Sequence, residues 1–208
     1  MAILLKDLMV WVFYPLWLIA GGIDYVCHRR SRIDHTSGSS EAWLHVGQFL
    51  TLAVFLWLVA CITVTKASLL FMGIALAAHT ALAFVDVSYT IGRRYISPLE
   101  QMVHGFMDVL PLVAFALLVI LNLSHPVPDD ALQPAWHMVT TSKGILLFGS
   151  YLVLAGAPVL EELLRTRRAG TPNATPRKSL PQALPSTDSE RFHAGHGRPL
   201  SPTGDKQR

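Results

Sequence analysis

Five apolar blocks, each close to the length needed to cross a lipid bilayer, constrain this chain more than any other feature. A transmembrane helix needs about 20 predominantly apolar residues. The blocks extend over Leu8 to Tyr25, Trp43 to Val64, Ser68 to Val87, Leu99 to Leu121 and Lys143 to Leu160. Hydrophobic residues make up 51% of the chain and charged residues only 15%, which is low for a soluble globular protein. The sequence therefore predicts an all-α, polytopic membrane protein with five transmembrane helices.

Lysine and arginine are distributed unequally between the two sides of the predicted membrane. Fourteen of them follow the first, third and fifth blocks, whereas only Lys6, Lys66 and Lys143 fall on the opposite side. Cytoplasmic segments carry such an excess of basic residues. We therefore expect a multi-pass protein of the cell inner membrane with its N-terminus outside and its C-terminus in the cytoplasm. The net charge of +3 reflects this topology, and we expect no nucleic-acid partner.

The composition changes abruptly after the fifth block. Residues 166–208 are rich in Pro, Ser, Thr, Gly and Arg and contain few apolar residues. Such a segment buries too little surface to offset the entropy lost on ordering. We predict a transmembrane helical domain over residues 1–165 and a disordered cytoplasmic tail over residues 166–208.

Each of the first four blocks carries one carboxylate and one imidazole at its predicted cytoplasmic end. A spacing of four or seven residues places two side chains on one face of a helix. The pairs are Asp24 with His28, Glu41 with His45, His79 with Asp86, and Glu100 with His104. Ionisable residues inside a membrane are energetically costly and indicate function. We therefore predict that helices 1–4 form a four-helix bundle in which all eight residues bind metal.

The helical rise of about 1.5 Å per residue sorts these eight residues into two layers. The deeper layer holds Asp24, His45, His79 and His104, and the shallower layer holds His28, Glu41, Asp86 and Glu100. Each layer offers four ligands, so the prediction is two neighbouring metal ions. Gln48, Asp108 and Tyr89 flank the ligands as candidate hydrogen-bonding partners. Boundary ion pairs, a proton relay and haem ligation stay open as alternatives.

Imidazole and carboxylate ligands without thiolate favour iron, with manganese or zinc as alternatives. In this ligand chemistry the chain resembles the membrane di-iron desaturases and hydroxylases, although it lacks their H-x-x-H-H boxes. The resemblance implies a non-haem di-iron oxidoreductase that acts on a lipid-soluble substrate at the cytoplasmic side. Such an enzyme would lie among membrane lipids and take electrons from an external donor.

Two other classes of function are left open by the sequence. The first is a zinc-dependent membrane lipid hydrolase, in which Glu41, Glu100 or Asp86 serves as the general base for a metal-bound water. The second is a non-enzymatic metal or haem carrier, a transporter, or an assembly factor for a respiratory complex. The sequence assigns no catalytic residue and identifies neither the substrate nor the electron donor.

Overall fold

The computed structural model describes residues 2–126, 131–135 and 142–170. In chain order its elements are α1 (Ala2–Leu8), η1 (Met9–Phe13), α2 (Tyr14–Ser31), η2 (Ile33–His35), α3 (Ser39–Cys61), α4 (Lys66–Thr90), α5 (Pro98–Ser124), α6 (Ser142–Tyr151), η4 (Leu152–Gly156) and α7 (Ala157–Ala169). The π-helical turns η1 and η4 join their neighbours into continuous helices, and the described residues contain no strand. Five helices are long and apolar enough to cross a membrane, which confirms the predicted all-α architecture with five long apolar helices.

The helices begin and end at residues whose chemistry fixes these boundaries. At the start of α5, Ser97 accepts a hydrogen bond from the Glu100 backbone N–H, and the Glu100 carboxylate accepts one from the Ser97 backbone N–H. Pro98, which has no backbone N–H to satisfy, fills the first turn, as the sequence predicts. At the same end of the bundle, α2 stops at Arg32, which adopts a left-handed φ of 53°, and Gly38 (φ 73°) precedes α3. These caps make the connection between α2 and α3 short.

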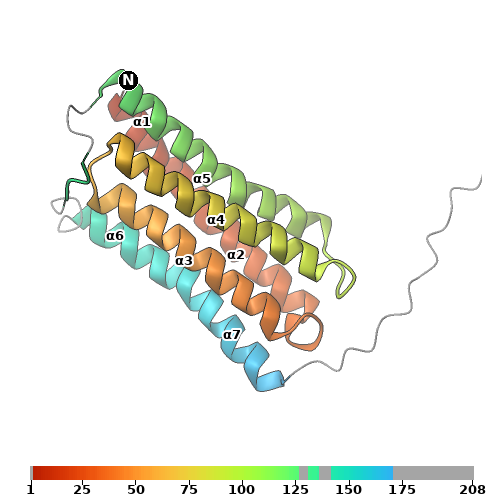
Figure 1. Cartoon of the computed structure of the whole chain (residues 1–208). Coiled ribbons are helices and arrows are strands. Elements are labelled where there is room, and N and C mark those ends of the chain that lie inside the picture. The colour runs from red at the N-terminus through yellow and green to blue at the C-terminus, as the bar shows by residue number, and fades with distance from the viewer. Residues whose placement is uncertain (1, 127–130, 136–141, 171–208) are drawn as a thin grey trace, which may run out of the picture. The chain divides into compact units, whose positions relative to one another are not determined.

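The long helices run side by side (Figure 1), and their contacts close into a ring. Around the ring, α2 contacts α5, α5 contacts α4, α4 contacts α3, α3 contacts α7, and α7 returns to α2. The sequence predicted that helices 1–4 alone form the bundle. The structure differs, because α7 packs against both α2 and α3 and so contributes its own inward-facing side chains.

Apolar side chains line the ring in its middle and toward the connection between α3 and α4. One cluster contains Phe55, Leu58, Met72 and Leu118, and a second contains Trp17, Leu52, Leu76 and Tyr151. Gly47 lets α3 and α4 approach closely, since a Cβ there would lie 3.0 Å from Cδ1 of Leu82. The opposite end of the ring, where α2, α4 and α7 end, holds ionisable side chains instead.

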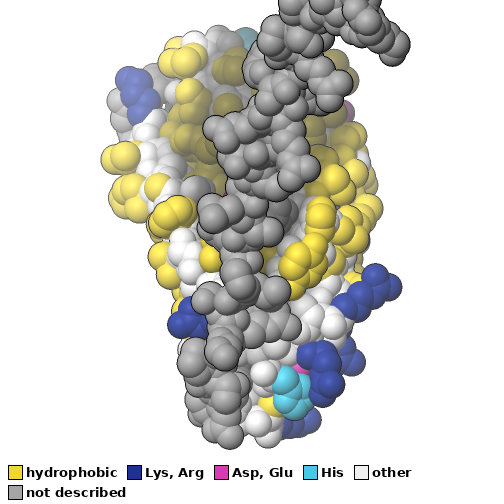
Figure 2. Space-filling view, turned by 90° about the vertical axis from the view of Figure 1, so that its right-hand side faces the viewer, with side chains coloured by type: hydrophobic (Ala, Val, Ile, Leu, Met, Phe, Trp, Pro, Cys, Tyr) yellow, Lys and Arg dark blue, Asp and Glu magenta, His cyan; other side chains and the backbone are white. Residues whose placement is uncertain are grey.

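The outward faces of the helices are also apolar. Large hydrophobic side chains such as Leu70, Phe84 and Leu123 are more than 60% exposed. Figure 2 shows hydrophobic side chains over much of the visible face, with Lys and Arg gathered toward its lower end. A continuous exposed apolar surface is unfavourable in water and is typical of contact with lipid.

The chain separates into two units, Met1–Pro176 and Arg177–Arg208. The last helix of the first unit, α7, ends at Ala169, four residues past the predicted domain boundary at residue 165. The predicted tail from residue 171 onward lies outside the described residues, so its disorder stays a prediction.

Candidate metal centre

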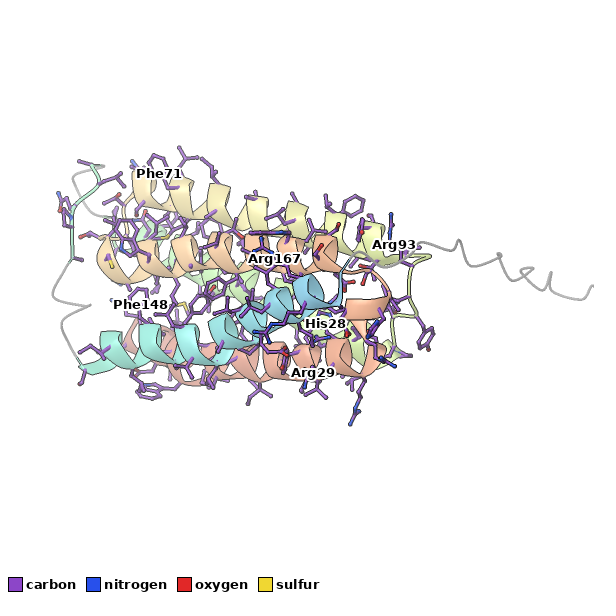
Figure 3. All side chains as sticks on the ribbon, turned by 90° about the horizontal axis from the view of Figure 1, so that it is seen from below. His28, Arg29, Phe71, Arg93, Phe148 and Arg167 are labelled. Carbon is purple, nitrogen blue, oxygen red and sulfur yellow. The ribbon has the colours of Figure 1, made fainter. Side chains whose placement is uncertain are left out.

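Ionisable side chains from all five long helices meet inside one end of the ring. The eight residues predicted from the sequence all lie there: Asp24 and His28 on α2, Glu41 and His45 on α3, His79 and Asp86 on α4, and Glu100 and His104 on α5. All are buried except His104, which is half-buried. Figure 3 shows His28 pointing into the ring, at the end opposite to Phe71. A ninth residue, Glu162 on α7, is also buried in this cluster.

Glu162 holds two imidazoles in parallel. Its Oε2 lies 3.0 Å from Nδ1 of His28, and its Oε1 is hydrogen-bonded to Nδ1 of His45. The two imidazole rings stack with their centroids 4.6 Å apart and their planes 5° from parallel. One carboxylate from α7 therefore orients one histidine from α2 and one from α3.

This geometry assigns the tautomers of the two histidines. An ionised carboxylate only accepts hydrogen bonds, so each Nδ1 must carry a proton, and in a neutral imidazole the lone pair then lies on Nε2. Both Nε2 atoms face carboxylates. Nε2 of His28 lies 3.4 Å from Glu100 and 3.5 Å from Asp24, and Nε2 of His45 lies 3.1 Å from Asp86. Lone pairs at such distances repel one another, so each Nε2 requires either a proton or a metal cation beside it.

The donor atoms form three groups that could hold a cation. Two of them define adjacent positions: Asp24, His28, Glu100 and His104 offer one donor atom each within 4.8 Å of one another, and Glu41, His45 and Asp86 form a second such group. The third, His28, His45 and Glu162, is the hydrogen-bonded set described above. Glu41 also lies 4.0 Å from Nε2 of His28, which places it between the two positions. Both groups combine members of the two predicted layers. The layer assignment is therefore corrected: helix packing, and not depth alone, decides which residues converge.

The charge of the cluster requires compensation by cations or protons. Five buried carboxylates (Asp24, Glu41, Asp86, Glu100 and Glu162) face one buried guanidinium among the described residues, that of Arg94. Protonation of His28, His45 and His104 would leave one negative charge, which a proton on one carboxylate would remove. Two divalent cations would neutralise the cluster with every imidazole neutral. Buried charge is strongly unfavourable unless compensated, and the residues fit either arrangement.

One buried carboxylate oxygen in the second donor group has no hydrogen-bond partner in the residues that the structure describes. Oδ1 of Asp86 is buried and makes no hydrogen bond within the described part of the chain. In the first donor group, Oδ1 of Asp24 lies 3.0 Å from Nε2 of His104, and Nε2 of His28 lies 3.4 Å from Glu100. Buried polar atoms are rarely left without a hydrogen bond. Oδ1 of Asp86 fits a cation that would complete its coordination.

Arg94, in the connection between α4 and α5, ties two of these carboxylates together. Its Nη2 lies 2.5 Å from both Glu41 and Glu100. Burial by itself lowers the pKa of Arg94, but the hydrogen bonds that it donates to Glu100 and Glu41 outweigh burial and raise that pKa. The guanidinium is therefore a permanent positive charge. It anchors the 91–97 connection to the site.

His79 stands apart from the two donor groups. Its Nδ1 lies 3.2 Å from the backbone oxygen of Gln48, and its buried Nε2 faces Asp108 at 3.4 Å. Asp108, predicted as a hydrogen-bonding partner of a ligand, therefore partners His79. Gln48 donates a hydrogen bond to Asp86 at 3.3 Å. Tyr89 donates to the backbone oxygen of Ser37 and does not enter the cluster.

A cavity of about 100 Å³ adjoins the cluster on the side of the apolar core. Its wall includes His28, His45 and Glu162 from the cluster, His79 beside it, and Trp17 and Leu52 from the core. The predicted ligands therefore border a small cavity, and His79 lines the same cavity.

Sequence reasoning missed Glu162 and Arg94. Glu162 lies in "PVLEELLRTRR", at the same end of the fifth block as the other ligands, but it has no histidine four residues away. The sequence signal that could have identified Glu162 is a carboxylate within an apolar membrane helix. Arg94 resembles an ordinary basic residue at a membrane boundary, and only its burial against Glu41 and Glu100 distinguishes it from Arg93.

No model of a known protein family, no curated protein and no solved structure matches this chain.

Proposed function

We propose that this chain is an inner-membrane, dinuclear metalloenzyme, a non-haem di-iron oxidoreductase that acts on a lipid-soluble substrate. The observation that carries the proposal is the pair of stacked imidazoles of His28 and His45. Glu162 fixes both Nδ1 atoms, so both Nε2 atoms point at carboxylates. Metal-bound histidines usually donate their second N–H to such a carboxylate. Two parallel histidines at this separation fit two neighbouring metals, which in dinuclear sites lie about 3.5–4 Å apart.

The ligand set favours iron over zinc. Structural and catalytic zinc sites use three or four ligands, typically with cysteine or several histidines. The two donor groups here, bridged by Glu41, instead combine two carboxylates with one or two histidines each. This composition is typical of di-iron and di-manganese carboxylate centres inside helical bundles.

Iron would supply the redox chemistry, and the protein would supply position and charge. Dioxygen is the oxidant that fits this chemistry: two electrons from a C–H bond of the substrate and two from an external donor reduce it fully. His79 and Asp108 line the cavity beside the donor groups and are placed to move a proton to or from that space. The apolar wall of Trp17 and Leu52 would exclude water and admit a hydrocarbon.

The proposed orientation places the site at the cytoplasmic side. The ends of α2 and α7 and the connection between α4 and α5 carry the arginines that follow the first, third and fifth spans. The excess of basic residues at this end supports a cytoplasmic location for it, with the N-terminus outside.

Metal analysis of the intact protein tests the proposal directly. Protein expressed with iron, manganese and zinc all present, and purified in detergent, should contain two iron ions per chain with the Mössbauer signature of a coupled pair. Reduced protein should consume dioxygen. His104→Ala should lose iron, whereas His125→Ala, at the far end of α5, should retain it. Two zinc ions per chain would favour the lipid hydrolase, and a metal-free protein would overturn the proposal.

A further inference from the structure

A second and larger cavity occupies the other half of the ring. Its volume is about 510 Å³, within the range of roughly 300–1,000 Å³ typical of ligand pockets. Residues of α1, η1, α2, α3, α5 and α6 line it, so it lies between the first long helix and α3, α5 and α6 and is partly open to the outside. Its lining is overwhelmingly apolar, with Phe13, Phe55 and Leu118 among the residues that face it.

The cavity is elongated along the helices. On α5 its wall runs from Leu110 to Asn122, a distance of about 18 Å at the rise of an α-helix. The wall formed by the first helix runs from Lys6 to Trp17, a similar length. The cavity thus reaches from one end of the ring through more than half of a hydrocarbon core that is about 30 Å thick.

The two ends of this cavity differ in chemistry. At the outer end its lining includes the exposed basic residues Lys6 and His125, and no acidic residue lines it within the part of the chain that the structure describes. At the inner end it stops at Trp17 and Leu52, which also line the small cavity beside the candidate metal centre. Trp17 is held there by a hydrogen bond from its indole N–H to the Met107 backbone oxygen.

We propose that this cavity binds the hydrocarbon chain of a single-chain amphiphile with an anionic head, such as a long-chain fatty acid. The head lies near Lys6 and His125, and the distal end of the chain rests on Trp17, facing the metal centre. This inference deepens the proposed function, on which it rests for the identity of the substrate. It places the end of the chain that is farthest from the head closest to the reactive metals.

Trp17 serves as a built-in reporter of chain position. Bromine quenches indole fluorescence only at contact, and Trp17 is 9% exposed, whereas Trp11, Trp43 and Trp57 are more than 40% exposed. A parent protein in which phenylalanine replaces every tryptophan except Trp17 isolates its signal. The probes are two fatty acids of equal length in unbrominated detergent, one brominated near the carboxylate and one near the methyl end.

We expect saturable quenching that is several-fold stronger with the distally brominated acid. Ala114→Phe narrows the cavity and should weaken this quenching several-fold, whereas Ala116→Phe, on the exposed face of the same helix, should leave it unchanged. Equal quenching by the two acids, or no quenching, would overturn the inference. Comparing the two acids requires no substitution in the cavity wall. The quenching measurement needs no metal. A metal-free protein would therefore refute the proposed function, whereas the quenching result tests the fatty-acid cavity independently.

Discussion

The substitution Glu162→Gln separates a dinuclear centre from a network of ion pairs. The glutamine keeps the shape of the side chain but replaces one accepting oxygen by an N–H₂ group, which only donates. One imidazole, His28 or His45, keeps its Nδ1–H···O bond. The other must accept at Nδ1 and carry its proton on Nε2, and that proton competes with the metal for Nε2.

The expected loss follows from this asymmetry. Losing an orienting partner weakens metal binding by about 10- to 100-fold, or roughly 1.4–2.7 kcal/mol. We expect that loss at one of the two positions, and near-normal affinity at the other. Titration of metal-free protein with ferrous iron under anaerobic conditions should therefore change from two tight binding events to one tight and one weak event.

Glu161→Gln is the matched control for this measurement. Glu161 precedes Glu162 on α7 but contacts Tyr25 and Arg29 at the surface of the ring, so its loss should leave both binding events intact. If Glu162→Gln binds two ferrous ions as tightly as the unchanged protein, Glu162 does not orient the metal ligands. The stacked imidazoles of His28 and His45 then do not indicate a pair of metals.

Three further predictions test other parts of the site. His79→Ala should retain both metals, because His79 lies outside both donor groups, whereas His104→Ala should lose one; metal content of the two variants decides, and loss of metal from His79→Ala would restore the layered assignment. Arg94→Ala leaves the buried carboxylates of Glu41 and Glu100 without their cation and should destabilise the protein by about 3–5 kcal/mol, whereas Arg93→Ala should be nearly neutral. Thermal unfolding in detergent measures both variants, and equal effects would show that the buried ion pairs of Arg94 do not stabilise the protein. A reporter active only outside the cell should respond when fused after α5 and stay silent when fused after α7; the reverse pattern would place the site outside.

The long apolar blocks determined the helical architecture from the sequence alone. A segment of about 20 apolar residues has few alternatives to a helix, because its backbone groups must pair internally where water is absent. The pairing of Glu100 with His104, four residues apart behind Ser97 and Pro98, was predictable for the same reason: spacing along one helix is a local property. That is why all eight predicted residues lie at one end of the ring.

Only the tertiary structure decided which of these residues meet. Helical spacing fixes the depth of a side chain but not the rotation of its helix against its neighbours, so depth placed His79 with the ligands although it pairs with Asp108. The same limit hid Glu162, which has no partner on its own helix and joins His28 and His45 only because α7 packs between α2 and α3. Contacts between residues more than 100 positions apart depend on packing, and no local pattern records them.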